Sequence, residues 1–136
     1  MQISASIKNN AEQNSVMVTT NGAAKELAIP QKANGQGSAV NGGELLFLAL
    51  ATCFCNDIYR EAAKRQLVIK AVDVTVNGEF GSEGEPGFNI RYNVNIDAEA
   101  TPAEIRDLVL YVDKIAEVHN TLRVGTAVTF VESASF

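Results

Sequence analysis

The sequence predicts an α+β protein with largely antiparallel sheets around a long buried central helix. Segments of alternating apolar and polar residues come in neighbouring pairs, as in β-hairpins, and two segments of helical periodicity are inserted between them. The expected order is therefore βββαββαβ, and helices placed between hairpins are typical of the α+β class. With 136 residues, 46% of them hydrophobic, the chain has the size and composition of a single domain spanning residues 1–136.

Three short strands are expected before the first helix. They are residues 2–8, 15–20 and 26–29. Asn21-Gly22 is a strong signal for a tight hairpin turn after the second of them. Pro30 ends the third strand, and residues 31–41, rich in Gly, Asn and Ser, are expected to form a loop.

The first helix is expected to begin at Asn41 or Gly42. Asn41 can cap the free N–H groups of the first turn, and Glu44 follows three residues later, as in a capping box. Residues 45–63 contain few polar side chains before Asn56, which predicts a buried helix with an exposed, charged end at residues 57–66. One subunit of this size offers little to cover such a helix on every side, so we expect a symmetric homodimer.

The second half of the chain predicts a long hairpin, a second helix and a closing strand. Residues 68–80 and 88–96 both alternate and form the hairpin. Thr101, Pro102 and Glu104 are the cap, first residue and capping-box acid of the helix. Residues 126–131 are predicted to be the last strand.

Composition excludes several classes of function. A net charge of −5 and a pI near 4.8 argue against binding to nucleic acid or to anionic membranes, because both need clustered Lys and Arg. The apolar run at residues 45–51 is too short to span a bilayer, and the first fifteen residues do not have the pattern of a signal peptide. We therefore expect a cytoplasmic protein whose two cysteines are reduced at rest.

Two motifs resemble the OsmC/Ohr family. The segment from Asn41-Gly42-Gly43-Glu44 through Cys53 is similar to the family's central-helix motif, with the family's spacing of nine residues between the acid and the cysteine. The segment from Val118 to Leu122, which contains His119, is similar to a second family motif that precedes a Val-rich strand.

The resemblance implies an intertwined homodimer with the central helices at its heart and a thiol site near the interface. In many members this site reduces hydroperoxides, an activity of oxidative or osmotic stress defence. The first cysteine attacks the peroxide and becomes a sulfenic acid, and a second cysteine then forms a disulfide with it. Here the resemblance assigns the nucleophile to Cys53 and suggests a site role for Glu44.

The chain departs from the family pattern in three ways. Ala116 stands at the position of the second cysteine, and Glu117 stands where proline is usual. The acid of the hydroperoxide-resistance branch falls on Gly43, and no arginine precedes Arg60. The match is thus closer to the general OsmC-like branch, and an external thiol reductant is needed in place of the built-in pair.

Cys53 needs help to become a thiolate. A free thiol has a pKa of about 8.5, and the middle of a helix lies far from the positive end of its dipole. Arg60 lies two turns further on the same helical face, and His119 or Arg123 could approach from elsewhere.

Each candidate also has a structural alternative. Cys53 could be an inert buried thiol, and Glu44 could be only a helix cap. Arg60 could be a solvated charge at the helix end, and His119 could bond the last carbonyls of the second helix.

Cys55 and metal binding are separate questions. Residues i and i+2 of a helix point about 200° apart, so a disulfide between Cys53 and Cys55 would need local unwinding. The same divergence disfavours a metal site on the two sulfurs, and neither a metal nor another cofactor is expected.

Three functions remain open from the sequence. The first is a thiol-dependent peroxidase that reduces organic hydroperoxides or hydrogen peroxide through Cys53, in an apolar pocket shared between subunits. The second is a non-catalytic OsmC-like dimer that binds a small apolar ligand, with Cys53 as a packing residue. The third is a purely structural interaction module.

Overall fold

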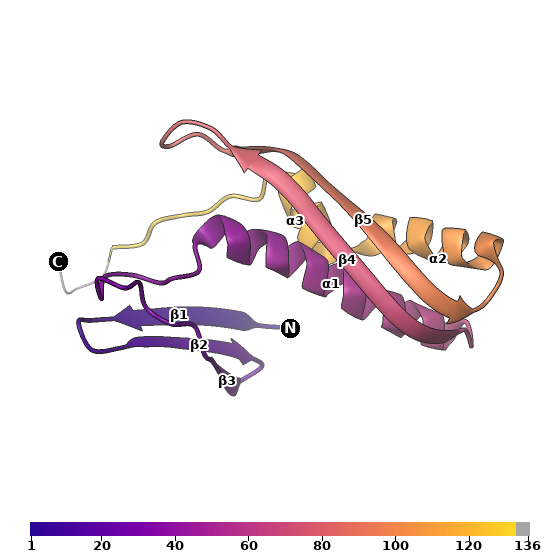
Figure 1. The fold of residues 1–136 in the computed structure, drawn as a ribbon, viewed down its shortest axis with the longest axis horizontal. Helices are drawn as coiled ribbons and strands as arrows, with labels where there is room; N and C mark the ends of the chain where they lie inside the picture. The colour runs from indigo at the N-terminus through magenta and orange to yellow at the C-terminus, as the bar shows by residue number, and fades with distance from the viewer. Residues whose placement is uncertain (133–136) are drawn as a thin grey trace. The chain divides into compact units, whose positions relative to one another are not determined.

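The computed structural model describes residues 1–132 of the chain, which form two compact units (Figure 1). The first unit comprises residues 1–45 and the second begins at Leu46. The helix α1 (Gly42–Lys64) begins in the first unit and continues into the second. None of the helices in the described residues combines the length and apolar character needed to cross a membrane.

The first unit contains an antiparallel three-stranded sheet. Its strands β1 (Ile3–Asn9), β2 (Asn14–Thr20) and β3 (Ala23–Leu27) follow one another in the sheet in chain order. The predicted turn is confirmed, since Asn21 and Gly22 both have positive φ, of 47° and 84°. Because this turn uses only two residues, β3 pairs from Ala23 onward and begins three residues before the predicted start at residue 26.

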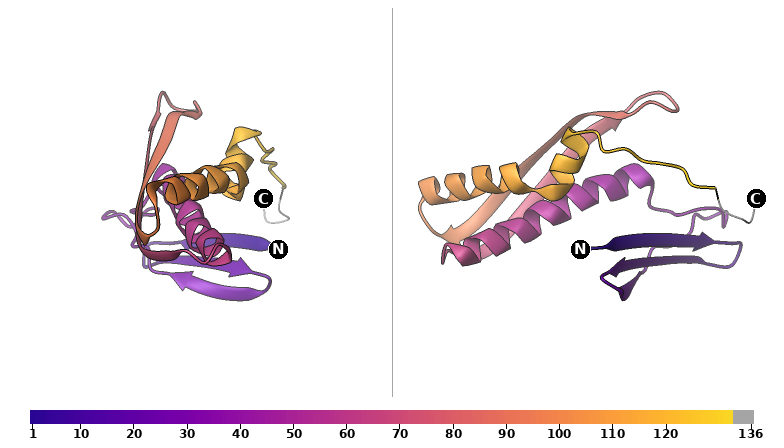
Figure 2. Two further views of the ribbon diagram at one scale, coloured as in Figure 1. Left: turned by 90° about the vertical axis from the view of Figure 1, so that its right-hand side faces the viewer. Right: turned by 180° about the vertical axis from the view of Figure 1, so that it is seen from behind.

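The second unit is built on a long hairpin. Strands β4 (Val68–Phe80) and β5 (Gly87–Glu99) pair antiparallel, and helices α2 (Pro102–Ile115) and α3 (Glu117–Arg123) follow. The bounds predicted for β4 are confirmed, whereas β5 is longer than the predicted residues 88–96. Figure 2 shows the hairpin lying along one side of α1 and α2.

The core of the second unit lies between these helices and one face of the hairpin. Its fully buried members come from α1, from α2 and from the residue after α2; they are Phe54, Ile58, Ala62, Leu108, Val112 and Ala116. Strand residues at alternating positions close the core from the other side; they are Val72, Val74, Tyr92, Val94 and Ile96.

The charged end of α1 is only partly exposed, which corrects the prediction. Asp57 and Glu61 retain 3% and 4% of their accessible surface, whereas the side chain of Arg60 is 44% exposed. Both acids are buried because ion pairs with Arg60 and Lys64 satisfy their oxygens. On another part of α1, Leu48 and Tyr59 are 59% and 45% exposed, so cover by a second subunit stays a prediction.

The start of α2 is as predicted. The Thr101 hydroxyl accepts a hydrogen bond from the N–H of Glu104, and the Glu104 carboxylate accepts one from the N–H of Thr101 at 2.8 Å. This reciprocal pair is a complete capping box with Pro102 at the first helical position.

The predicted closing strand is wrong. Residues 126–131 have no regular secondary structure, and Val128 is fully exposed. A strand needs a partner ladder, so a β-favouring composition alone does not create one. The structure instead adds α3, which makes the observed order βββαββαα and places His119 inside a helix.

Candidate functional site

The candidate site is centred on the thiol of Cys53, which is half-buried on α1. Its Sγ donates to Oδ2 of Asp57, 3.8 Å away and one helical turn further along. Oε2 of Glu117, the first residue of α3, lies 4.0 Å from the same sulfur. The thiol is therefore bracketed by two carboxylates from two different helices.

Arg60 reaches Cys53 only through Asp57. Its Nη1 lies 2.6 Å from Asp57 Oδ1, and its Nε donates to Glu61 Oε1 at 2.9 Å. Lys64 binds the same oxygen of Glu61 at 2.8 Å. The guanidinium thus holds the Asp57 carboxylate in place, with its other oxygen directed to the thiol.

These surroundings keep the thiol protonated at rest. Burial is the largest effect and raises the pKa of Cys53, a backbone hydrogen bond with Val118 opposes it, and the charges of Asp57 and Glu117 raise it further. Burial also raises the pKa of Asp57, against the opposing charge of Arg60. The site consequently pairs a weakly acidic thiol with a carboxylate that is more basic than usual.

His119 is a buried, neutral residue of α3. It is 5% exposed, and its ring packs against Phe54 and, edge-on, against Tyr92 at a centroid distance of 4.8 Å. Burial and the charge of Arg123 lower the pKa of His119, and neither ring nitrogen has a hydrogen-bond partner within residues 1–132.

The helix-capping alternative for His119 is therefore wrong. Other side chains donate hydrogen bonds to the carbonyls at the end of α2. The amide of Asn120 donates to the carbonyl of Lys114 at 2.9 Å, and Arg123 donates to that of Asp113 at 2.8 Å.

Arg123 is held away from the thiol by its own ion pair. Its Nη2 lies 2.6 Å from Asp113 Oδ1, which also accepts a hydrogen bond from the hydroxyl of Tyr92. Beside this network lies a mostly apolar hollow of about 220 Å³; its lining residues are Leu50, Ile90, Tyr92, His119, Leu122 and Arg123.

Glu44 is occupied by the capping of α1. Its N–H donates to Asn41 Oδ1 at 2.9 Å, and its carboxylate accepts from the Asn41 N–H at 2.7 Å. The predicted cap is confirmed, and a role of Glu44 in chemistry stays a prediction.

The two cysteines are both free thiols. Cys55 borders a shallow hollow together with Val72 and Val74 of β4, whereas Cys53 faces Glu117 of α3. This divergence is the one expected for residues two apart on a helix.

The structure also brings together groups that could ligate a metal ion. One ligand atom each from Cys53, Asp57 and Glu117 lies within 4.8 Å of the others. Asp57 already uses one oxygen on Arg60, so a cation would have to compete with the guanidinium.

Asp57 and Glu117 are the site residues that sequence reasoning missed. Asp57 could have been found, because residue i+4 on a helix faces residue i. Glu117 had no local signal, since its approach depends on how α3 packs.

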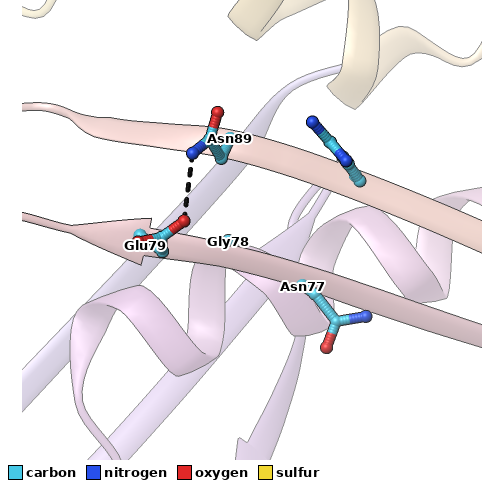
Figure 3. A pocket seen from close by; sticks show the side chains of 5 residues that line it. Asn77, Gly78, Glu79 and Asn89 are labelled. Carbon is cyan, nitrogen blue, oxygen red and sulfur yellow. Dashed lines mark hydrogen bonds between the residues drawn. The ribbon is translucent and has the colours of Figure 1, made fainter.

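A second hollow, lined by polar and charged residues and a glycine, lies on the β4–β5 hairpin (Figure 3). Asn89 donates to Glu79 Oε1 at 3.0 Å across the two strands, next to a bulge at residues 77–79. Gly78 lies between Asn77 and Glu79, and a Cβ there would lie 2.6 Å from the ring of Phe47. Glycine at this position therefore leaves room for the Phe47 ring, which a larger residue would displace.

A long helix that carries a half-buried thiol and packs on an antiparallel hairpin defines a thiol-containing α+β protein. A family model described as OsmC-like protein matches residues 35–131. The chain belongs to the OsmC-like protein family.

Solved structures have the same fold. An OsmC-like protein from Mycoplasma pneumoniae is 21% identical, with 90% of this chain and 86% of that chain covered and a TM-score of 0.62. An organic hydroperoxide resistance protein from Legionella pneumophila is 22% identical, with 90% of each chain covered and a TM-score of 0.57.

A third structure contains a bound small molecule. It is a putative organic hydroperoxide resistance protein from Vibrio cholerae with captopril bound in one of its active sites. It is 24% identical, with 90% of this chain and 85% of that chain covered and a TM-score of 0.57. None of the curated proteins compared with the sequence matches it.

Proposed function

We propose that this protein is a thiol-dependent peroxidase that reduces organic hydroperoxides or hydrogen peroxide through Cys53. The observation that carries the proposal is the hydrogen bond from the Cys53 thiol to Asp57, whose carboxylate is fixed by Arg60. A nucleophile in contact with an oriented base is the arrangement that covalent chemistry needs.

Asp57 is the proton carrier in the proposed reaction. It accepts the thiol proton as Sγ attacks the terminal peroxide oxygen, and the O–O bond breaks with both electrons leaving on the alkoxide. The alkoxide takes the proton from Asp57 and departs as an alcohol, which leaves a sulfenic acid on Cys53. The burial that raises the pKa of Asp57 supports this role, because it makes the carboxylate a better proton acceptor.

An external thiol completes the cycle. Ala116 is fully buried at the position where the family's second cysteine is expected, and it has no sulfur. The sulfenic acid condenses with a free thiol to give a mixed disulfide and water. A second thiol then releases Cys53 as the thiol.

Relatives support the substrate class. The Legionella pneumophila structure is of an organic hydroperoxide resistance protein, and the Vibrio cholerae structure has captopril in an active site. We extend to this chain the reduction of hydroperoxides, with the apolar hollow beside Leu50 and Leu122 as the space for an organic group.

We further propose that residues 1–136 act as one OsmC-like domain in a homodimer. The family match, over residues 35–131, crosses the boundary between the two compact units, which supports their joint function.

Turnover of cumene hydroperoxide with dithiothreitol tests the peroxidase. Wild type and Cys55→Ser should consume peroxide, and Cys53→Ser should lose at least about 100-fold in rate, because the nucleophile is gone. Equal consumption by wild type and Cys53→Ser would refute the proposal.

The second candidate, a non-catalytic dimer that binds a small apolar ligand, is favoured by one observation. The hollow beside the buried His119 is mostly apolar, which suits such a ligand, and neither ring nitrogen of His119 is hydrogen-bonded within residues 1–132. Intact mass after exposure to peroxide at near-equal concentration separates the two. An unchanged mass favours the binding protein, and a gain of one or two oxygen atoms on Cys53 favours the peroxidase.

A further inference from the structure

The sulfur of Cys53 lies in a negatively charged environment. Asp57 and Glu117 are the charged groups nearest to it, at 3.8 and 4.0 Å, and both raise its pKa. In the described part of the chain, the cation next to them is Arg60, which binds Asp57 and Glu61.

The cluster keeps a negative balance. Its carboxylates are those of Asp57, Glu61 and Glu117, and its cations are Arg60 and Lys64. Glu117 forms no ion pair among residues 1–132, and the charge of Arg60 acts on it only from a distance, so the three carboxylates still outnumber the two cations. The protein as a whole carries a net charge of −5, which adds to the same sign.

We propose that this acidic cluster makes Cys53 select its thiol reductant by charge, so that cationic and neutral small thiols react and anionic thiols are disfavoured. The inference rests on the proposed peroxidase function, because it names the class of the second substrate. An attacking anionic thiol must bring its negative charge within a few ångströms of Glu117 and Asp57, whereas an ammonium group there is attracted.

The selected step is the attack on the sulfenic acid. The reductant's sulfur forms a bond to Sγ of Cys53, and the hydroxyl leaves as water with the reductant's proton. A second molecule of the same thiol attacks the mixed disulfide, and the products are the free Cys53 thiol and the symmetric disulfide of the reductant. The charge of the reductant matters in both attacks, since both occur at the same place.

Disulfide exchange with Cys53 measures this selection without peroxide. We would compare cystamine, 2-hydroxyethyl disulfide and dithiodiglycolate, which are cationic, neutral and anionic, in the Cys55→Ser protein at pH 8 and low salt. Each rate constant is divided by that of the same disulfide with 2-mercaptoethanol, a neutral thiol, which removes the difference in leaving-group acidity. The normalised rate constants should fall in that order, with at least about a tenfold ratio between cystamine and dithiodiglycolate. The ratio should shrink in 0.5 M salt, because salt screens exposed charges.

Glu117→Gln tests the residue itself. It should reduce the cation-to-anion ratio by about threefold or more, since it removes one of the two charges nearest the sulfur. Glu117→Gln also changes the fraction of Cys53 that is thiolate. This fraction is the same for every disulfide, so it cancels in the cation-to-anion ratio. Glu83→Gln, in the turn between β4 and β5, makes the same change in net charge and should leave the ratio unaltered.

Two results would overturn the inference. One is that the normalised rate constants of the Cys55→Ser protein, with Glu117 unchanged, do not depend on the charge of the disulfide. The other is an equal change of the ratio in Glu117→Gln and Glu83→Gln, which would show an effect of net charge alone.

Failure of the peroxidase is distinguishable from failure of charge selection. Peroxide turnover without any order among the disulfides refutes charge selection and leaves the peroxidase standing. An ordered exchange without peroxide turnover refutes the peroxidase.

Discussion

Cys53 differs from an activated thiol in the sign of its neighbours. Cysteines with a lowered pKa lie beside cations or at helix N-termini, whereas this one lies beside two carboxylates in the middle of a helix. Its reactivity must therefore come from proton transfer during the reaction, with Asp57 as the acceptor.

The pH dependence of peroxide reduction should report this arrangement. Attack by the free thiolate adds to the path assisted by Asp57, and because burial and two acids raise the pKa of Cys53 above its ordinary value, that contribution should still be rising with pH at neutrality. Glu117→Gln removes one raising charge, so the rise should move to lower pH and the rate at pH 7.5 should increase about threefold. An initial-rate profile from pH 6 to 10 measures both. A decrease at pH 7.5 in this variant would contradict the assignment.

His119 should make stability depend on pH. Burial lowers its pKa in the folded state, so the unfolded chain binds the proton more tightly, and protonation favours unfolding. Its stabilising effect is present above about pH 6.5, the ordinary value, and is lost progressively as the pH falls below it. Urea unfolding at pH 7.5 and pH 5.5 should show a fall in the free energy of unfolding that is larger, by about 1 kcal/mol, in wild type than in His119→Phe.

The His119→Phe comparison has a built-in control. His119 is the single histidine of the chain, so carboxylates and cysteines contribute alike to both proteins. An aromatic replacement keeps the ring contacts with Phe54 and Tyr92. The same fall in both proteins would contradict the prediction.

At the scale of elements, the sequence predicts the features that depend on neighbouring residues but not those that depend on contacts between distant segments. The turn at Asn21-Gly22 and the capping box of α2 depend on residues three or fewer apart, so the sequence alone predicts them. The strand expected at residues 126–131 depends on a partner ladder, and α3 depends on packing against the core, so neither could be predicted from local pattern.

The capping box of α2 should contribute measurably to stability. Thr101→Ala removes the hydroxyl that accepts the Glu104 N–H, and it should lower the free energy of unfolding by about 1 kcal/mol. Glu104→Gln keeps a side-chain acceptor for the Thr101 N–H and should lower it less. Urea denaturation of the two variants measures the difference. Equal losses would contradict the reciprocal cap.

At the scale of the whole molecule, the sequence predicts the family and the position of the thiol, but only part of the site. Cys53 and Arg60 could be placed by helical periodicity, and Asp57 was within reach of the same argument. Glu117 could not be predicted in this way, because it lies 64 positions away from Cys53 in the chain. Such contacts between distant segments depend on the fold.

Homodimer formation should be visible in solution. Leu48, Tyr59 and Leu122 are large apolar residues left 40–59% exposed, and burying them against a second copy would be favourable. Light scattering after size exclusion should give twice the chain mass of 14.5 kDa for wild type, and Leu48→Lys should lower the measured mass toward that of a single chain. A measured mass equal to that of one chain for wild type at 50 μM would refute the dimer.

The protonated state of Cys53 has a consequence for how such a residue is detected. Alkylating probes such as iodoacetamide report thiolates, so at neutral pH they should label Cys53 more slowly than a cysteine of ordinary acidity. A proteome survey that ranks cysteines by the speed of alkylation would place Cys53 among the inert ones. A probe for sulfenic acids, applied after peroxide, would rank the same sulfur among the responsive ones.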